Sequence, residues 1–311
     1  MKTFSATDAA ISGFVLVREH FKTVAVWVLI ATIVSAIVSV TMIGLFGAEL
    51  EAFTTLSQNN STDPTETLQA MAKLGPFALF SLVYSVAFYS VLLAAIYRAV
   101  LRPADARRAY LRFGADELRQ AGVSILLGLL LFAAYLVLLV AVTLILVILG
   151  AIAPPLAALV GLLIVPASFG VLIFLGVRLS LANVLTFTEG KINVFGSFAL
   201  TKGRFWPMFG AYFVATILAV VVYLLLFLII TLLGGALSGF NLDTLNDLMQ
   251  SQKLTLESLL TPTGVLSLAV GGLITVLTSV TIYAPSAFIY REIVERAADA
   301  APAAPRGPFD V

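Results

Sequence analysis

Long stretches without a charged side chain dominate the pattern of polar and hydrophobic positions along this chain. Five of them, free of Asp, Glu, Lys, Arg and His, cover residues 23–48, 74–97, 120–177, 205–242 and 258–290. A helix that crosses the hydrocarbon layer of a bilayer, about 30 Å thick, needs about 20 apolar residues. Each stretch is long enough for one such helix, and the longest is long enough for two. The pattern therefore predicts an integral membrane protein with six crossings.

The longest stretch is divided by Pro154 and Pro155, because neither has the N–H group that a continuous helix needs. The pattern then predicts an all-α fold in which six transmembrane helices form three hairpins. Residues 1–296 are expected to form a single transmembrane domain, and residues 297–311, rich in Ala and Pro, a disordered cytoplasmic tail. The expected helices cover about 24–47, 76–101, 121–153, 156–185, 207–238 and 262–290.

Lys and Arg residues are distributed unevenly between the two sides of these helices. Of the 18 Lys and Arg residues, only Lys73 and Lys253 fall in the loops of one side, and the other 16 fall on the opposite side. Because loops rich in Lys and Arg stay in the cytoplasm, this bias places both termini there. We expect a multi-pass protein of the bacterial inner (cytoplasmic) membrane.

The composition agrees with membrane residence and removes several classes of function. Hydrophobic residues make up 60% of the chain and charged residues 11%, whereas a soluble domain carries about 25% charged residues. The net charge of +1 gives no reason to expect a nucleic-acid partner. The chain has no Cys, which excludes disulfides, thiol catalysis and cysteine metal sites.

Each predicted hairpin is preceded by a short charged segment, at about 6–23, 104–119 and 191–206. The last segment has the clearest apolar face, on which Ile192, Phe195, Phe198, Ala199 and Trp206 recur at helical spacing, with Lys202 in the same stripe and Arg204 opposite. A helix that lies in the membrane surface has this pattern. We therefore predict cytoplasmic, interfacial, amphipathic helices.

The segment at 104–119 is basic but has no clean apolar face. Its Arg107, Arg108 and Arg112 are candidates for contact with anionic lipid head groups, together with Lys202 and Arg204 of the third segment. An alternative stays open, in which these cations act only as signals for membrane orientation.

Three predicted helices end in an arginine, at Arg98, Arg178 and Arg291. Tyr97 and Tyr290 precede two of them, and each Tyr-Arg pair is expected to anchor its helix end at the membrane surface. Arg178 has two interpretations. It is either a contact for a lipid phosphate or a substrate anion, or a cation that only marks the end of its helix.

Candidate catalytic groups are scarce. No acidic residue lies within a predicted crossing, although ion-coupled transporters normally carry ionisable groups there. His20 is the only histidine, and one histidine cannot form a zinc site. We expect no enzymatic activity, no metal and no cofactor.

The stretch Ser197-Phe-Ala-Leu-Thr-Lys-Gly-Arg-Phe-Trp206 resembles a signature of bacterial six-helix membrane proteins, S-W-x-L-T-K-G-x-F-W. Those proteins belong to the glycerophosphoryl diester phosphodiesterase membrane domain family. The segment Arg178-Leu-Ser-Leu-Ala182 resembles a second element of that family, R-x-S-L-A, whereas Phe198 departs from the usual Trp. The residues that match the signature are Ser197, Thr201, Lys202, Gly203, Phe205 and Trp206.

The resemblance implies membrane residence and not catalysis. Phosphodiesterase activity in such proteins belongs to a separate soluble barrel domain with its own metal-binding acids and histidines, which the present chain does not match. We expect a non-catalytic protein that organises the envelope or its lipids, or that acts as a scaffold. Its expected partners are membrane lipids, including anionic ones, and a membrane protein or a second copy of the chain. The alternative is a transporter or flippase of an amphiphilic substrate, with Arg178 and kinks at Pro166 and Pro285 along a polar groove.

Overall fold

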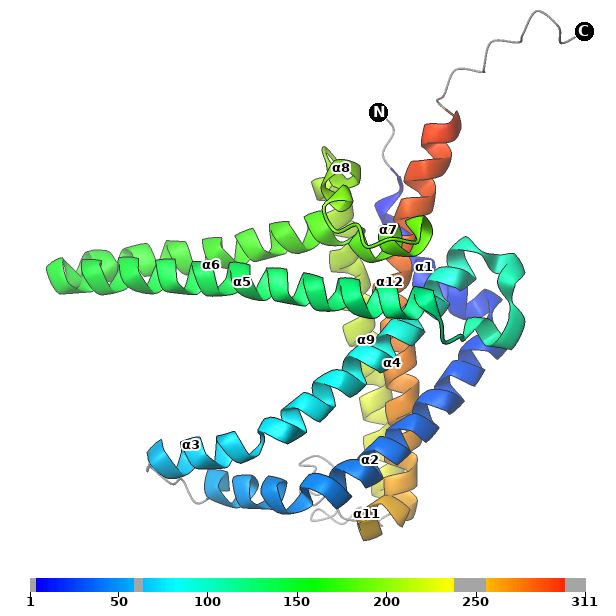
Figure 1. Ribbon diagram of the computed structural model, residues 1–311, viewed down its shortest axis with the longest axis horizontal. Coiled ribbons are helices and arrows are strands. Elements are labelled where there is room, and N and C mark those ends of the chain that lie inside the picture. Colours follow the sequence, from blue (N-terminus) through cyan, green and yellow to red (C-terminus); the bar gives the residue numbers. More distant parts are fainter. Residues whose placement is uncertain (1–3, 59–63, 238–255, 300–311) are drawn as a thin grey trace, which may run out of the picture.

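The computed structural model describes residues 4–58, 64–237 and 256–299, and every regular element within these ranges is helical. Six of the helices are long and apolar enough to cross a membrane, as judged by length and composition (Figure 1). This confirms the prediction of an all-α, multi-pass membrane protein. The six are α2 (Phe21–Gln58), α4 (Gly75–Leu101), α5 (Ala115–Ile152), α6 (Pro154–Leu179), α9 (Phe205–Leu237) and α12 (Pro262–Asp299).

Shorter helices connect or flank the long ones. These are α1 (Ala6–Glu19), α3 (Pro64–Lys73), α7 (Ala182–Glu189), α8 (Gly196–Thr201) and α11 (Leu256–Leu260), with two 3₁₀ turns, η1 (Pro103–Asp105) and η2 (Arg107–Tyr110). The predicted segment at 104–119 is therefore not one interfacial helix. It consists of two tight turns, an extended stretch and the first turn of α5.

Several helix bounds differ from the predicted ones. Pro154 and Pro155 form the first turn of α6, where a missing N–H costs nothing, so their interruption of the stretch is confirmed. The predicted helix at 156–185 ends early, because a turn at Ser180 separates α6 from α7. Helix α5 begins before position 121 because Asp116 and Glu117 favour a helix N-terminus.

Two further differences lie at the ends of the predicted crossings. Helix α2 continues from the predicted end at 47 to Gln58. Helix α12 continues to Asp299, so residues 297–299 of the predicted tail are helical and the remainder of that tail lies outside the described residues.

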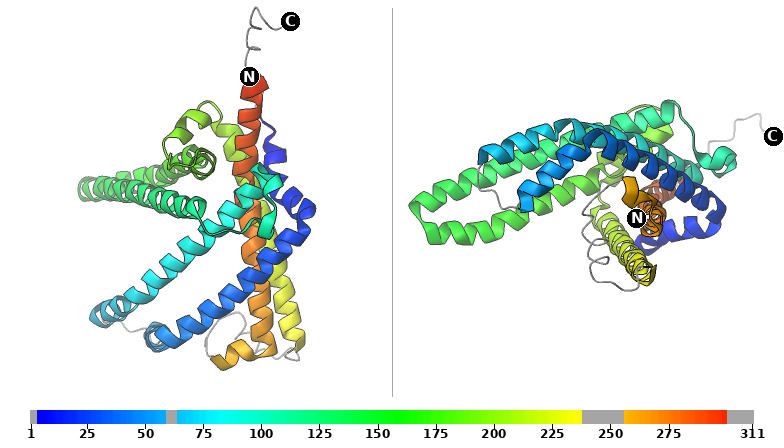
Figure 2. Two further views of the ribbon diagram at one scale, coloured as in Figure 1. Left: turned by 45° about the vertical axis from the view of Figure 1, so that its right-hand side comes forward. Right: turned by 90° about the horizontal axis from the view of Figure 1, so that it is seen from below.

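The long helices converge at one end and spread at the other (Figures 1 and 2). Helices α9 and α12 pack side by side, α1 lies against α12, and the hairpin of α5 and α6 projects sideways from them. Most side chains on the projecting parts of α5 and α6 are exposed and apolar, as on helices that face lipid.

Glycines allow the closest helix contacts. A Cβ atom added to Gly13 of α1 would lie 2.7 Å from Thr281 Cα of α12, and one added to Gly272 of α12 would lie 2.9 Å from Thr32 N of α2. Helix α2 packs mainly against α12 and only slightly against α4. The backbones approach most closely where a glycine removes the side chain.

The largest buried cluster lies where the helices converge. It combines Trp27 of α2, Tyr97 of α4, Phe187 of α7 and Val280 of α12. The face of α1 that packs against α12 is formed by small residues and Leu16, whereas Phe14 of α1 is exposed. The long helices thus spread from a packed cluster of buried residues at the point where they converge.

Candidate functional site

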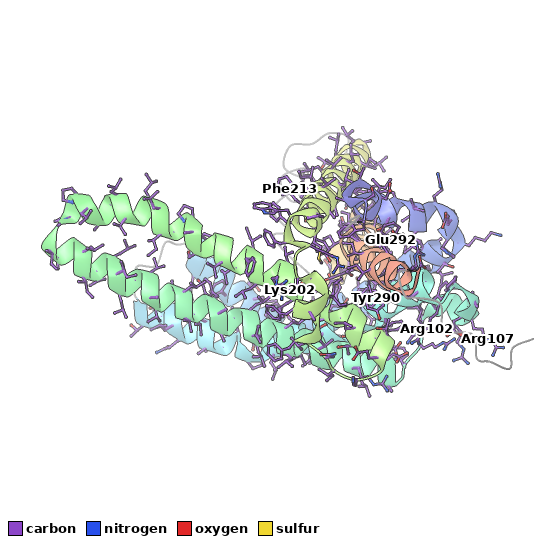
Figure 3. All side chains as sticks on the ribbon, turned by 90° about the horizontal axis from the view of Figure 1, so that it is seen from above. Arg102, Arg107, Lys202, Phe213, Tyr290 and Glu292 are labelled. Carbon is purple, nitrogen blue, oxygen red and sulfur yellow. The ribbon has the colours of Figure 1, made fainter. Side chains whose placement is uncertain are left out.

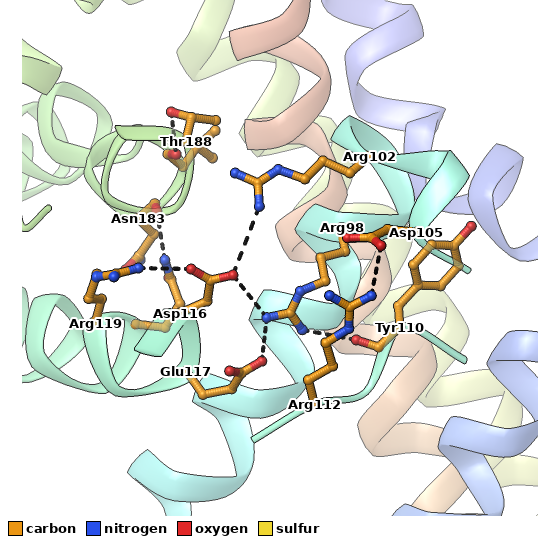
Figure 4. A network of polar contacts seen from close by, with 12 residues as sticks. Arg98, Arg102, Asp105, Tyr110, Arg112, Asp116, Glu117, Arg119, Asn183 and Thr188 are labelled. Atoms are coloured by element: carbon orange, nitrogen blue, oxygen red, sulfur yellow. Dashed lines mark hydrogen bonds and ion pairs between the residues drawn. The ribbon is translucent and has the colours of Figure 1, made fainter. Parts of the chain in front are cut away.

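A buried arginine stands at the centre of this convergence (Figure 4). The side chain of Arg98, in the last turn of α4, is 2% exposed. Its Nη1 donates to the carbonyl oxygen of Tyr110 at 2.9 Å, and its Nη2 donates to Asp116 Oδ2 at 3.2 Å and to Glu117 Oε1 at 2.5 Å. Both carboxylates belong to the first turn of α5, so one guanidinium joins the end of α4 to the start of α5.

The chain between these helices makes the contact possible. A cation at the C-terminal turn of α4 and two anions at the N-terminal turn of α5 are each favoured by the dipole of their own helix. The connecting residues 102–114 fold back in two tight turns, which brings the oppositely charged ends together.

The prediction that Tyr97 and Arg98 form an anchor at the membrane surface is wrong. Tyr97 is 1% exposed, and its hydroxyl lies 3.2 Å from Ser286 Oγ of α12. Two acidic residues at positions 116 and 117, directly before a long apolar stretch, were the signal in the sequence that Arg98 has buried partners. The pairing itself could not be read from the pattern, because it depends on how the loop folds.

The loop before α5 is held in a left-handed conformation. The φ values are 54° at Arg108, 52° at Ala109 and 64° at Tyr110. Residues other than glycine adopt such positive φ values only at an energetic cost. Two donors from the helices hold the loop in this shape. Trp27 Nε1 of α2 donates to the carbonyl oxygen of Ala109 at 2.7 Å, and Arg98 binds the next carbonyl.

The candidate lipid contacts on this loop differ from one another. Arg112 donates to Asp105 Oδ1 at 2.7 Å, and this hydrogen bond is the main reason why the pKa of Asp105 lies below its ordinary value. Arg107 and Arg108 are exposed, and neither forms an ion pair with any residue that the structure describes. Arg107 lies at the outer edge of the molecule in Figure 3.

The residues of the Ser197–Trp206 motif divide into two groups. The first group fixes the break between α6 and α7. Ser197 Oγ donates to the carbonyl oxygen of Arg178 at 2.7 Å and accepts from Leu181 N at 3.2 Å, and Thr201 Oγ1 donates to the Ser197 carbonyl at 2.8 Å. Ser197 and Thr201 are both fully buried. Gly203, with φ of +72°, adopts the left-handed backbone that ends the motif helix.

The second group faces outward. Lys202 is exposed, and its side chain makes no hydrogen bond or ion pair with the described part of the chain (Figure 3). Trp206 is 75% exposed and Phe195 67% exposed. Arg204 is half-buried, and its Nη1 donates to the carbonyl oxygen of Leu200 at 2.8 Å. The rings of Phe205 and Phe209 stack at 5.9 Å. We call Ile192, Phe195, Lys202 and Trp206 the motif surface.

Arg178 lies at the C-terminal turn of α6, beneath α8. Its guanidinium carbon lies 5.1 Å from the centre of the Phe198 ring, and its buried Nε has no hydrogen-bond partner in the described residues. Phe198 is the position at which the chain departs from the resembling signature. Phenylalanine, like tryptophan, offers a ring face to the cation.

The three arginines that end predicted helices share one feature. Each guanidinium carbon lies over a phenylalanine ring, at 5.7 Å for Arg98 over Phe187 and at 5.4 Å for Arg291 over Phe288, besides the Arg178 contact. Their environments differ, since Arg98 is buried in ion pairs whereas Arg291 is half-buried and lies 3.8 Å from Glu295. The side chains therefore do not share a common anchoring role.

Within the described ranges, no group of three or more His, Cys, Asp or Glu side chains is placed to hold a metal ion. No family model, no curated protein and no solved structure matches this chain. Function is therefore argued from the geometry of its own side chains.

Proposed function

We propose that this chain is a non-catalytic, multi-pass protein of the bacterial inner membrane that holds anionic lipid at its cytoplasmic face. The observation that carries the proposal is the exposure of Lys202, which directly follows the short helix α8, together with the exposure of Phe195 before that helix and of Trp206 at the start of α9. An apolar surface with a free cation suits the boundary between head groups and acyl chains.

The arrangement of the motif supports this role. Ser197, Thr201 and Gly203 hold the backbone, and Lys202 and Trp206 are thereby presented on the surface. Tryptophan favours the membrane interface, because one end of its ring system is apolar and the other carries an N–H donor. A lysine stem can lie along the acyl chains while its ammonium group reaches a phosphate.

We further propose that the chain is a relative of the glycerophosphoryl diester phosphodiesterase membrane domain proteins, without a catalytic role of its own. Its carboxylates near the convergence are occupied by arginine. Asp105 pairs with Arg112, and Asp116 and Glu117 pair with Arg98. An acid that is held in an ion pair is poorly placed to transfer protons to a substrate.

The test is lipid retention by the purified protein. The full chain is exchanged into micelles with an equal mixture of a glycerol-headgroup (anionic) and a choline-headgroup (zwitterionic) phospholipid of identical chains, and retained lipids are counted by native mass spectrometry. A lysine near the surface contributes about 1 kcal/mol to binding anionic lipid, so Lys202→Gln is expected to weaken retention of the anionic lipid about fivefold.

Lys73→Gln is the matched control, because it removes the same charge from α3, at the far end of the molecule from the motif. It is expected to leave the preference for anionic lipid unchanged. Equal retention of anionic lipid by the wild type and the Lys202→Gln variant would contradict the proposed function.

A further inference from the structure

An apolar groove of about 640 Å³ lies between α4 and α5, beside the buried arginine. Its walls are formed mainly by aliphatic side chains, among them Leu82 and Val86 of α4 and Ile125 of α5. Ser90 and Glu117 also line it, at the end where the two helices converge. The groove is thus apolar along most of its length and polar at one end.

The two polar side chains at this end are buried and incompletely paired. Ser90 is 3% exposed and Glu117 is 5% exposed. Neither Ser90 Oγ nor Glu117 Oε2 has a hydrogen-bond partner among the described residues. Buried polar atoms of native proteins are nearly always hydrogen-bonded, so two free atoms in one groove indicate a missing partner.

The other interactions of Glu117 show which partner is missing. Its Oε1 accepts a hydrogen bond from Arg98, which fixes the carboxylate and leaves Oε2 directed away from the ion pair. A Cβ added to Gly114 would lie 3.7 Å from Oε2, at ordinary contact distance, so a side chain at position 114 would cover this oxygen. A carboxylate oxygen accepts most strongly from a cationic N–H donor.

The shape of the surrounding surface fits a molecule with two chains. A second apolar groove, of about 220 Å³, lies between α2 and α4 on the other side of α4. Both grooves are bordered by Ala87, Val91 and Phe113. Phe113 is 91% exposed, and a membrane is a setting in which such exposure is favourable.

We propose that these paired grooves bind a two-chain phospholipid with a primary ammonium head group. The ammonium donates to Glu117 Oε2 and to Ser90 Oγ, and the acyl chains lie on either side of α4. The inference rests on the proposed membrane role, but it uses a different surface and a different lipid from the motif surface around Lys202. No covalent step is involved.

The experiment compares ethanolamine and choline phospholipids with identical chains, titrated onto the full protein and followed by native mass spectrometry. The two head groups differ at the nitrogen, because the choline ammonium has no N–H to donate. We expect the ethanolamine lipid to bind at least tenfold more tightly than the choline lipid. Equal affinity for both lipids would overturn the proposal.

Two variants locate the site without breaking the Arg98 ion pair. Gly114→Leu fills the groove beside Glu117, and a φ of −169° is extended backbone that leucine adopts freely. Ser90→Ala removes one acceptor with almost no change in volume. Both are expected to reduce the preference for ethanolamine at least threefold. Gly128→Leu is the control on α5, the helix that Gly114 directly precedes, since a Cβ at Gly128 would meet no atom within 4 Å.

Each outcome is decisive. An ethanolamine preference that persists in both Gly114→Leu and Ser90→Ala would place the lipid elsewhere and overturn the inference. A lost preference in these two variants, with Gly128→Leu unaffected, supports it. Retention of anionic lipid depends on Lys202 and not on Gly114, so failure of one proposal is distinguishable from failure of the other.

Discussion

The guanidinium of Arg98 and the carboxylate of Glu117 form a buried ion pair, with 2.5 Å between Nη2 and Oε1. The pair joins the end of α4 to the start of α5, and Glu117 also lines the groove that carries the second proposal. Arg98 also binds Asp116 and the carbonyl oxygen of Tyr110, whereas the Glu117 side chain has no second polar partner among the described residues and depends on Arg98 for its stabilisation.

Loss of Arg98 should therefore be costly. Arg98→Met is expected to destabilise the protein by about 3–5 kcal/mol, because Glu117 would be left as an uncompensated buried charge. The measurement is the free energy of unfolding in detergent. The double variant Arg98→Met/Glu117→Leu should be more stable than Arg98→Met alone, since it removes both charges.

Arg112→Met serves as the control for that prediction. Its ion pair with Asp105 is between side chains that are 38% and 41% exposed, and such pairs contribute about 0–1 kcal/mol. Equal losses for Arg98→Met and Arg112→Met would show that the buried pair has no special role.

The contact between α1 and α12 depends on the absence of a side chain at Gly13. In Gly13→Ala the new Cβ would lie 2.7 Å from Thr281 Cα and 2.9 Å from the Val280 oxygen, both of them backbone atoms that cannot rotate away. We expect a loss of about 1–3 kcal/mol in the free energy of unfolding. Gly44→Ala on α2 is the control, because its Cβ would meet nothing within 4 Å. A Gly13→Ala variant as stable as Gly44→Ala would refute the close contact.

The left-handed positions predict effects of opposite sign. Gly203→Ala places a Cβ at φ of +72° and should cost about 1–2 kcal/mol, whereas Ala109→Gly relieves a φ of 52° and should stabilise the protein or leave it unchanged. Thermal unfolding of the two variants checks the signs. Destabilisation by Ala109→Gly of the same size as by Gly203→Ala would contradict the described loop.

The Asp105 carboxylate predicts a pH dependence. The hydrogen bond from Arg112 holds the pKa of Asp105 below its ordinary value of 3.8. A carboxyl group with a lowered pKa stabilises the folded state above its unfolded pKa, and this contribution disappears as the pH falls through the folded pKa.

Asp105→Asn should consequently be slightly less stable than the wild type near neutral pH and equally stable in strong acid. The effect is small, because the group is exposed to solvent. Unfolding midpoints of both proteins, measured from pH 6 downward, test the convergence. A difference that stays constant with pH would assign the effect to something other than the carboxylate.

The positions of the long helices could be predicted from the sequence, because the length and apolar composition of a segment are enough to identify a helix that crosses a membrane. The break at Pro154 followed from the same reasoning, since proline cannot donate the backbone hydrogen bond. The partners of each helix could not be predicted. In lipid, every apolar face is equally acceptable, so the pairing of α2 with α12 depends on the local fit around Gly272 and Thr32.

The candidate site was predicted only in part. Lys202 and Trp206 are exposed, but the segment predicted as one amphipathic helix over 191–206 forms a helix only from Gly196 to Thr201, and both side chains lie beyond its end. The burial of Arg98 was missed. An arginine at the end of an apolar stretch looks the same in the sequence whether its side chain extends into water or pairs with a buried carboxylate. Ser197 and Thr201 were recognised as motif residues, but their role in fixing the helix break needs the geometry of Arg178.

Contact between the motif surface and lipid is the central claim, and photocrosslinking from position 206 tests it most directly. A photoreactive residue replaces Trp206 in the full chain, which is reconstituted in bilayers with equal amounts of anionic and zwitterionic phospholipid. We predict adducts mainly with the anionic lipid, and loss of that bias in the Lys202→Gln background. Adducts in the proportions of the mixture, or none with lipid at all, would contradict the account.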